Sequence, residues 1–249
     1  MAGHSKWANI KRHKAKQDAV KGKLYTKLIR EVTVSAKLGG ADADSNPRLR
    51  AALDKAFAAN MSRDVIDRAI KRGAGGLEGA DVEEVRYEGY GPGGIAVMVD
   101  CMTNNRNRTV ADVRHAFTKC GGNLGTDGSV SYLFNKLGQI TFSSDADEEG
   151  IMELALSQNA EDVIVNEDKS IEVRTLPDHF QKIKDAMAAA GFKPQYAEIS
   201  MIAATNITVT DKESAEKLMH LIDMLEELDD VQEVYSNADI PEDVLAELE

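Results

Sequence analysis

The hydrophobic periodicity of the chain changes at residues 73–76, Gly-Ala-Gly-Gly, and this change constrains the fold more than any other feature. Before it, apolar residues recur three and four positions apart, which is typical of amphipathic helices. After it, apolar and polar residues alternate in short runs, which is typical of strands. The sequence therefore predicts an N-terminal helical domain, a glycine-rich hinge, and α/β structure beyond the hinge.

Three helices are predicted before the hinge. The first carries Leu24, Leu28 and Val32 on one face and ends at Gly39-Gly40. Asn46-Pro47 supplies an N-cap and a first helical residue for the second. Ser62 is expected to cap the third, which stops at Gly73. Residues 1–76 are assigned to this basic domain.

Two α/β units are predicted beyond the hinge. In residues 138–203 the patterns follow the order β-α-β-β-α-β, the split βαβ or ferredoxin-like arrangement. The flanking pieces are each too short for a layered domain, so residues 77–137 and 204–249 are expected to form one discontinuous α/β domain around the inserted unit. In the first piece, Thr109 is expected to cap a helix, and residues 129–134 to form a strand. The predicted fold class is α+β, with a three-helix domain followed by two ferredoxin-like α/β domains, one inserted in the other.

Charge is divided unequally along the chain. Residues 1–72 hold 17 Lys or Arg against 7 Asp or Glu, whereas residues 73–249 hold 13 against 35. A basic end on an acidic body favours binding of a polyanion at that end. The alternative is a basic helical surface that is merely solvated.

The N-terminal cations are the main candidates for nucleic-acid contacts. Residues 1–22 have too few apolar side chains to hold a helix alone, so we expect them to order only on their target. Trp7 could stack on a base, or could instead fill the core of the helical domain. Cations in such an array suit phosphates. The predicted contacts are His4, Lys6, Trp7, Lys11, Arg12, Lys14, Lys16, Lys21, Lys23, Lys27 and Arg30.

A second candidate lies in residues 104–108, Asn-Asn-Arg-Asn-Arg. This polar loop leads into a helix N-terminus, where backbone N–H groups bind anions, so Arg106 and Arg108 are predicted to contact phosphate. The alternative, weighted equally, is a capping loop whose arginines pair with the acidic body.

Motifs for catalysis and cofactors are missing from the sequence. It has no P-loop, no G-x-S-x-G and no H-E-x-x-H. The glycines at 89–94 are followed by a strand, which favours a hairpin turn over a dinucleotide site. The calcium-like loop that begins at Asp145 has Leu156 where a bidentate glutamate is needed. The histidines lack metal-ligand spacing, and Cys101 and Cys120 are expected to be buried thiols. We expect no enzyme activity, cofactor or metal.

The expected cellular location follows from the absence of a membrane-spanning run and of a signal peptide in the sequence. It has no run of about 20 apolar residues, and its N-terminus has no apolar signal core. We expect a cytoplasmic protein with no membrane partner. The oligomeric state is left open.

Several motifs, in order along the chain, resemble the YebC/PmpR family. They are residues 1–14 (MAGHSKWANIKRHK), 46–50 (NPRLR), 68–73 (RAIKRG), 87–94 (YEGYGPGG), 109–114 (TVADVR), 121–125 (GGNLG) and 128–130 (GSV). The match is densest in residues 1–135. Ser62 departs from the family pattern, in which proline is more frequent.

The resemblance implies a cytoplasmic protein with a helical domain and two α/β domains, one inserted in the other. Family members are generally labelled probable DNA-binding transcriptional regulators. A mitochondrial relative is a translational activator for cytochrome oxidase synthesis, and bacterial members are linked to ribosomes stalled on proline-rich stretches. The expected function is therefore nucleic-acid-binding regulation of gene expression, with DNA-binding transcriptional regulation first. The alternative is a ribosome-associated translation factor that binds ribosomal RNA.

Overall fold

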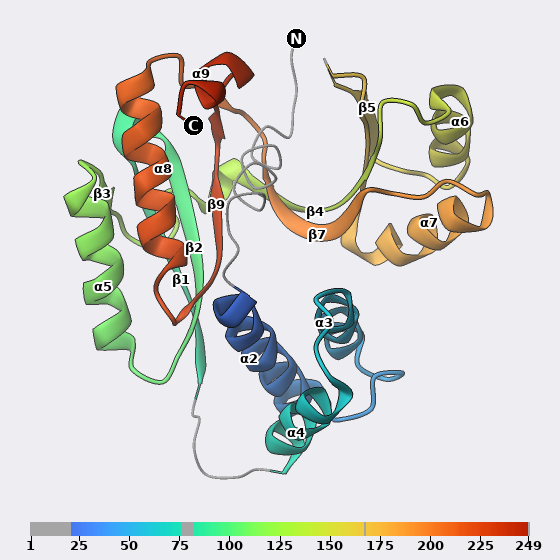
Figure 1. Ribbon diagram of the computed structural model, residues 1–249, viewed down its shortest axis with the longest axis horizontal. Coiled ribbons are helices and arrows are strands. Elements are labelled where there is room, and N and C mark those ends of the chain that lie inside the picture. The colour runs from blue at the N-terminus through green and yellow to red at the C-terminus, as the bar shows by residue number, and fades with distance from the viewer. Residues whose placement is uncertain (1–20, 76–81, 167, 249) are drawn as a thin grey trace.

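A computed structural model of the chain describes residues 21–75, 82–166 and 168–248, as three helices followed by two α/β units (Figure 1). The helices of the first unit are α2 (Lys21–Gly39), α3 (Pro47–Ala58) and α4 (Arg63–Ala74). They enclose a small core that includes Val32, Leu49 and Ala69. The α+β fold class and the three N-terminal helices are confirmed.

Local sequence signals account for the ends of these helices. The Asn46 side chain accepts the N–H of Leu49 at 3.1 Å and donates to the Ser35 carbonyl at 2.8 Å, so it caps α3 and ties it to α2. Ser62 occupies the N-cap position of α4, but its side chain makes no capping hydrogen bond, contrary to expectation. A Cβ at Gly73 would collide with the Thr33 carbonyl oxygen, so glycine is what allows α4 to pack this closely on α2.

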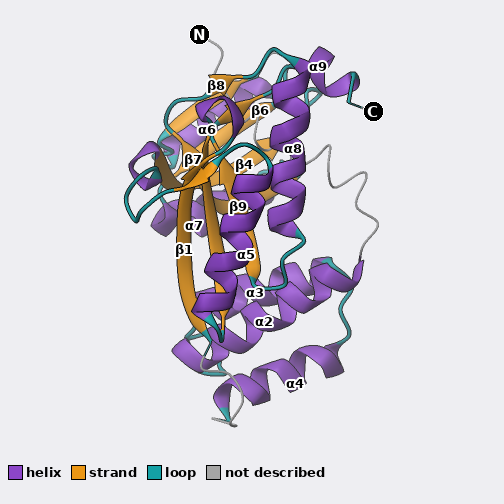
Figure 2. Ribbon diagram, turned by 90° about the vertical axis from the view of Figure 1, so that its left-hand side faces the viewer, coloured by secondary structure: helices purple, strands orange, loops and turns teal. Residues whose placement is uncertain are grey.

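The first α/β unit has a four-stranded antiparallel sheet with two helices on one face. Its strand order is β3-β1-β2-β9. Figure 2 shows the two helices in front of the strands, and the three-helix unit at the lower end of the molecule. The elements are β1 (Glu83–Tyr90), η1 (Pro92–Gly94), β2 (Ala96–Thr103), α5 (Arg106–Lys119), β3 (Asn123–Leu124), α8 (Lys212–Glu226) and β9 (Val231–Ser236). Both helices pack on the sheet through buried side chains such as Phe117 and Leu221.

Two expectations in this unit are wrong. Asn105, not Thr109, caps α5, since its side chain accepts the N–H of Arg108 at 3.1 Å. Thr109 lies buried one turn inside the helix. Residues 129–134 are not a strand, because η2 (Ser131–Leu133) intervenes before β4 begins. The Glu88 carboxylate shapes this loop by accepting the N–H groups of Gly128, Val130 and Ser131.

The second α/β unit has the predicted β-α-β-β-α-β order. Its strands run β5-β6-β4-β7, each antiparallel to its neighbours, which is the strand order of a ferredoxin-like sheet. The elements are β4 (Phe134–Phe142), α6 (Glu148–Ser157), β5 (Asp162–Val165), β6 (Ile171–Thr175), α7 (Pro177–Ala189) and β7 (Tyr196–Ala203). Strand β4 starts ahead of residue 138, the predicted start of the inserted unit.

The two sheets meet through a separate apolar cluster. Met98 and Tyr235, from the face of the first sheet opposite α5 and α8, pack with Phe134, Met201 and Ala203 at the ends of β4 and β7. A short parallel pair, β8 (Ile207–Thr208) with β10 (Ala238–Asp239), and α9 (Glu242–Ala246) complete the described chain. No helix in the described ranges has the length and apolar character to cross a membrane.

Candidate nucleic-acid interface

The predicted contact residues divide into two groups. His4, Lys6, Trp7, Lys11, Arg12, Lys14 and Lys16 lie outside the described residues. Lys21 begins α2, and the structure places the side chains of Lys23, Lys27, Arg30, Arg106 and Arg108.

Two cations of α2, Lys23 and Arg30, contact the loop that joins α8 to β9. Lys23 donates from Nζ to the Glu227 carbonyl at 3.2 Å. Arg30 donates from Nη1 to the carbonyls of Met102 at 2.9 Å and Asp229 at 2.7 Å. The spacing of Lys23, Lys27 and Arg30 along the chain puts them on one side of the helix. This side of α2 therefore lies against the first α/β unit.

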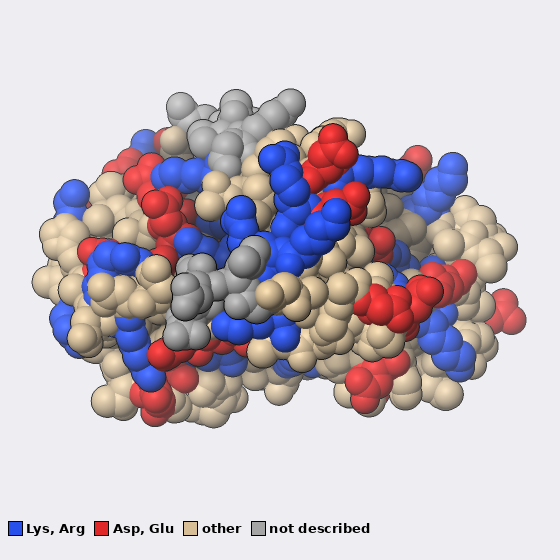
Figure 3. Space-filling view, turned by 90° about the horizontal axis from the view of Figure 1, so that it is seen from below, with Lys and Arg blue, Asp and Glu red and all other residues tan. Residues whose placement is uncertain are grey.

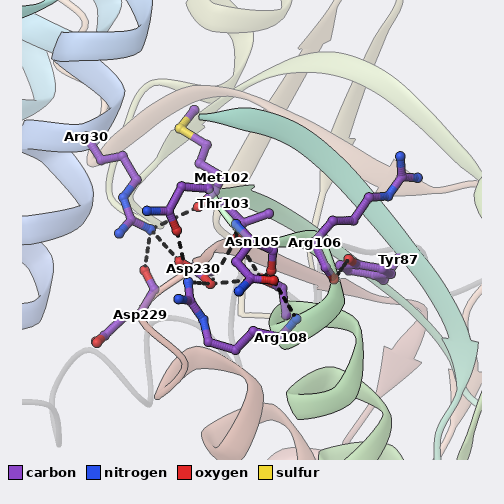
Figure 4. A network of polar contacts seen from close by, with 11 residues as sticks. Arg30, Tyr87, Met102, Thr103, Asn105, Arg106, Arg108, Asp229 and Asp230 are labelled. Carbon is purple, nitrogen blue, oxygen red and sulfur yellow. Dashed lines mark hydrogen bonds and ion pairs between the residues drawn. The ribbon is translucent and has the colours of Figure 1, made fainter. Parts of the chain in front are cut away.

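Asp230 is the centre of a polar network that joins the two units (Figure 4). Its carboxylate pairs with Arg30 Nη1 at 3.3 Å and with Arg108 Nη2 at 2.6 Å. It also accepts the hydroxyls of Thr109 at 2.8 Å and Thr103 at 3.1 Å. Only 9% of its side-chain surface is exposed.

Burial works to raise the Asp230 pKa, but the hydrogen bonds from Arg108, Thr109 and Thr103 outweigh it. The pKa is therefore held below its usual value, and the carboxylate is charged at neutral pH.

Three elements bring these groups together. Thr103 ends β2, and the Asn105 cap starts α5 so that Arg108 and Thr109 fall in its first turns. Asp230 immediately precedes β9, whose neighbour is β2, and its carbonyl accepts the Met102 N–H at 2.8 Å. The network is thus fixed by sheet pairing and a helix cap.

The two arginines of the 104–108 loop have different surroundings. Arg108 is paired with the acidic body, as in the alternative interpretation of this loop. The exposed Arg106 side chain points away from Asp230 in Figure 4, and its carbonyl accepts the Tyr87 hydroxyl at 3.4 Å.

Sequence reasoning missed two further sets of cations in the helical unit. Arg48 binds Glu31 at 2.8 Å and also Glu84, and Lys55 pairs with Glu198 at 3.6 Å, so both hold the helices against the α/β units.

The other set lies on helix α4, and its side chains are all exposed. Lys and Arg gather across the side of the molecule shown in Figure 3. The α4 set was detectable from the sequence, because its members lie opposite the apolar face of that helix. They are Arg63, Arg68, Lys71 and Arg72.

The chemistry available at this interface is electrostatic. The helical unit has 12 Lys or Arg against 6 Asp or Glu in residues 21–75. Across the described ranges, no three His, Cys, Asp or Glu side chains are grouped to hold a metal ion. The arrangement offers point charges and guanidinium donors to an anionic partner.

Comparisons with known proteins cover nearly the whole chain. Residues 5–76 match the model of the TACO1/YebC protein N-terminal domain, and residues 82–238 match that of the TACO1/YebC second and third domain. A probable transcriptional regulatory protein of Coxiella burnetii is 65% identical over 245 residues, 98% of this chain and all of that protein. A probable transcriptional regulatory protein of Methylococcus capsulatus is 63% identical over 248 residues, which cover 100% of this chain and 100% of that protein.

A solved structure also matches. The crystal structure of a conserved hypothetical protein from Aquifex aeolicus superposes with a TM-score of 0.80 at 47% identity, covering 91% of this chain and 93% of that one. Sequence and fold therefore place the chain among the same relatives.

Proposed function

Because the chain belongs to the TACO1/YebC family, we propose that it is a nucleic-acid-binding regulator of gene expression that binds DNA to regulate transcription. Relatives at 62–65% identity are named probable transcriptional regulatory proteins, which supports a regulatory role.

The observation that carries this proposal is the division of charge between the units. The helical end is basic and the α/β body is acidic, with 17 cations against 7 acids before residue 73 and 13 against 35 after it. A polyanion is attracted to the first part and repelled by the second. Nucleic acid is the polyanion that a regulator of gene expression acts on.

Binding is proposed to begin with the N-terminal cations and to continue onto the helical unit. Lys23 and Arg106 are exposed, and we propose that both contact phosphate. Arg30 and Arg108 keep 26% and 49% of their side-chain surface exposed while they are paired with Asp230. We propose that these two contribute charge where the units meet. The function needs no catalysis, cofactor or membrane and is exerted in the cytoplasm.

A second candidate is a translation factor that binds ribosomal RNA on the ribosome and relieves stalling on proline-rich stretches. The cations of α3 favour it, since Arg48 and Lys55 are both held in ion pairs with the body. A DNA-reading helix needs such side chains free for base edges in the major groove. Recognition through phosphate and shape suits folded RNA.

The test is crosslinking in living cells, followed by sequencing of the nucleic acid bound to the chain. The proposal expects enrichment of promoter DNA. Enrichment of ribosomal RNA instead would replace it with the translation-factor candidate. Recovery no greater than that from a variant with Lys11, Arg12, Lys14 and Lys16 changed to alanine would refute both.

A further inference from the structure

The outer face of α4 has the features of a second, rigid contact for nucleic acid. Its four cations, Arg63, Arg68, Lys71 and Arg72, are all exposed, with Asp64 and Asp67 as the acids among them. Four of the helix's twelve residues are thus cations.

The spacing of these residues puts the cations in two rows. Arg68 and Arg72 are four residues apart and lie about 6 Å from each other along the helix axis, while Arg63 and Lys71 lie about 12 Å apart. The opposite face carries Ile66 and Ala69, both buried. The helix therefore presents one charged side to solvent and one apolar side to its neighbours.

The α4 cations differ in what they contact from four other cations of the described residues. Arg30, Arg48, Lys55 and Arg108 are all held by carboxylates. Arg63, Lys71 and Arg72 make no side-chain hydrogen bond or ion pair with other described residues, and Arg68 donates only to the Asp64 carbonyl of its own helix. Their charge is therefore available to a partner.

Helix α4 is also fixed in place. Gly73 packs so closely on the Thr33 carbonyl that the helix cannot shift toward α2, and Ile66 is buried in the core shared with Leu28 and Met61. Cations on a fixed helix contact a regular partner at less entropic cost than cations on a chain that orders on binding.

We propose that this face of α4 binds the phosphate backbone of duplex DNA. The helix carries no aromatic side chain on which an unpaired base could stack, so a duplex suits it better than a single strand. The proposal rests on the proposed function and adds to it a defined set of backbone contacts: Arg63, Arg68, Lys71 and Arg72.

The test is the salt dependence of binding to duplex DNA, measured on the full chain by fluorescence anisotropy. The Arg68→Ala/Arg72→Ala variant is expected to make the negative slope of log K against log salt shallower by about 1.8, because each lost phosphate contact removes about 0.9. Arg68→Lys/Arg72→Lys keeps the charge and is expected to keep the slope. Lys182→Ala/Lys193→Ala changes the net charge equally at exposed sites in and after α7 and is expected to have no effect.

The outcomes separate this inference from the proposed function. If the wild-type chain shows salt-dependent binding and the Arg68→Ala/Arg72→Ala variant has the same slope, the α4 contact is wrong and the proposed function stands. If the slope changes on duplex RNA and not on duplex DNA, the assignment to DNA is wrong. If the wild-type chain binds no duplex, both fail. Melting temperatures of all variants check that they are folded.

Discussion

Replacing Asp230 by alanine is expected to lower the free energy of unfolding by about 2–4 kcal/mol at pH 7, because removing one member of a buried ionic network leaves its partners uncompensated. Arg30, Arg108, Thr103 and Thr109 would all lose an acceptor. The measurement is urea denaturation. Asp229→Ala is the matched control, since its exposed side chain lies outside the network and only its carbonyl contacts Arg30. An equal loss in both variants would contradict the account.

The pH dependence of this effect has a defined sign. The Asp230 pKa is lower in the folded state than in the unfolded chain, where an aspartate has a pKa of about 3.9. Its stabilising contribution is therefore complete above the unfolded pKa and is lost as pH falls through the folded pKa. The difference in unfolding free energy between wild type and Asp230→Ala is expected to shrink on acidification below about pH 4. A difference that stays constant through the acidic range would show that the carboxylate charge is not its cause.

Changing Lys11, Arg12, Lys14 and Lys16 to alanine is expected to weaken binding to duplex DNA by roughly 10³-fold at 0.1 M salt. Each lost phosphate contact removes about 0.9 from the salt slope, so four remove about 3.6 in total. The effect is larger than that of the α4 variant because twice as many cations are removed. Binding at low and high salt, measured by fluorescence anisotropy, gives both the affinity and the slope.

The control for this variant is an equal loss of charge on the α/β body. Changing four lysines there to alanine is expected to leave the slope unchanged, since the acidic surroundings keep nucleic acid away. If the two variants weaken binding equally, only net charge matters and the N-terminal cations have no specific role. The four control residues are Lys182, Lys184, Lys193 and Lys212.

Most of the fold could be predicted from the sequence, because its signals are local. Apolar residues at helical spacing predicted α2, α3 and α4. Gly39-Gly40 marked the end of α2, and Asn46-Pro47 marked the start of α3. Alternating runs and helical periodicity predicted the β-α-β-β-α-β order of the second α/β unit, and its strands have the order of a ferredoxin-like sheet.

The errors arose where distant residues decide between local alternatives. Asn105 and Thr109 are both good capping residues, and the sequence alone favoured Thr109. In the structure, the Thr109 hydroxyl instead donates to Asp230, 121 residues away. No local sequence pattern predicts the contact between Thr109 and Asp230.

The same limit applies to the candidate interface. Clustering of cations predicted that the N-terminal end is basic, but not which cations the body already holds. Arg30 and Arg108 meet the same carboxylate although 78 positions separate them in sequence. This follows from the pairing of β2 with β9 and from the packing of α2 against the first α/β unit. The exposed cations of α4 were overlooked because their helix was interpreted for its apolar face.

The claim that this chain binds nucleic acid through its basic end is tested most directly by titrating the intact wild-type protein against a duplex DNA at several salt concentrations. The account predicts saturable binding whose log K falls linearly with log salt, with a slope of about −3.6 or steeper, as four or more neutralised phosphates require. Absence of binding at low salt, or a slope near zero, would contradict it.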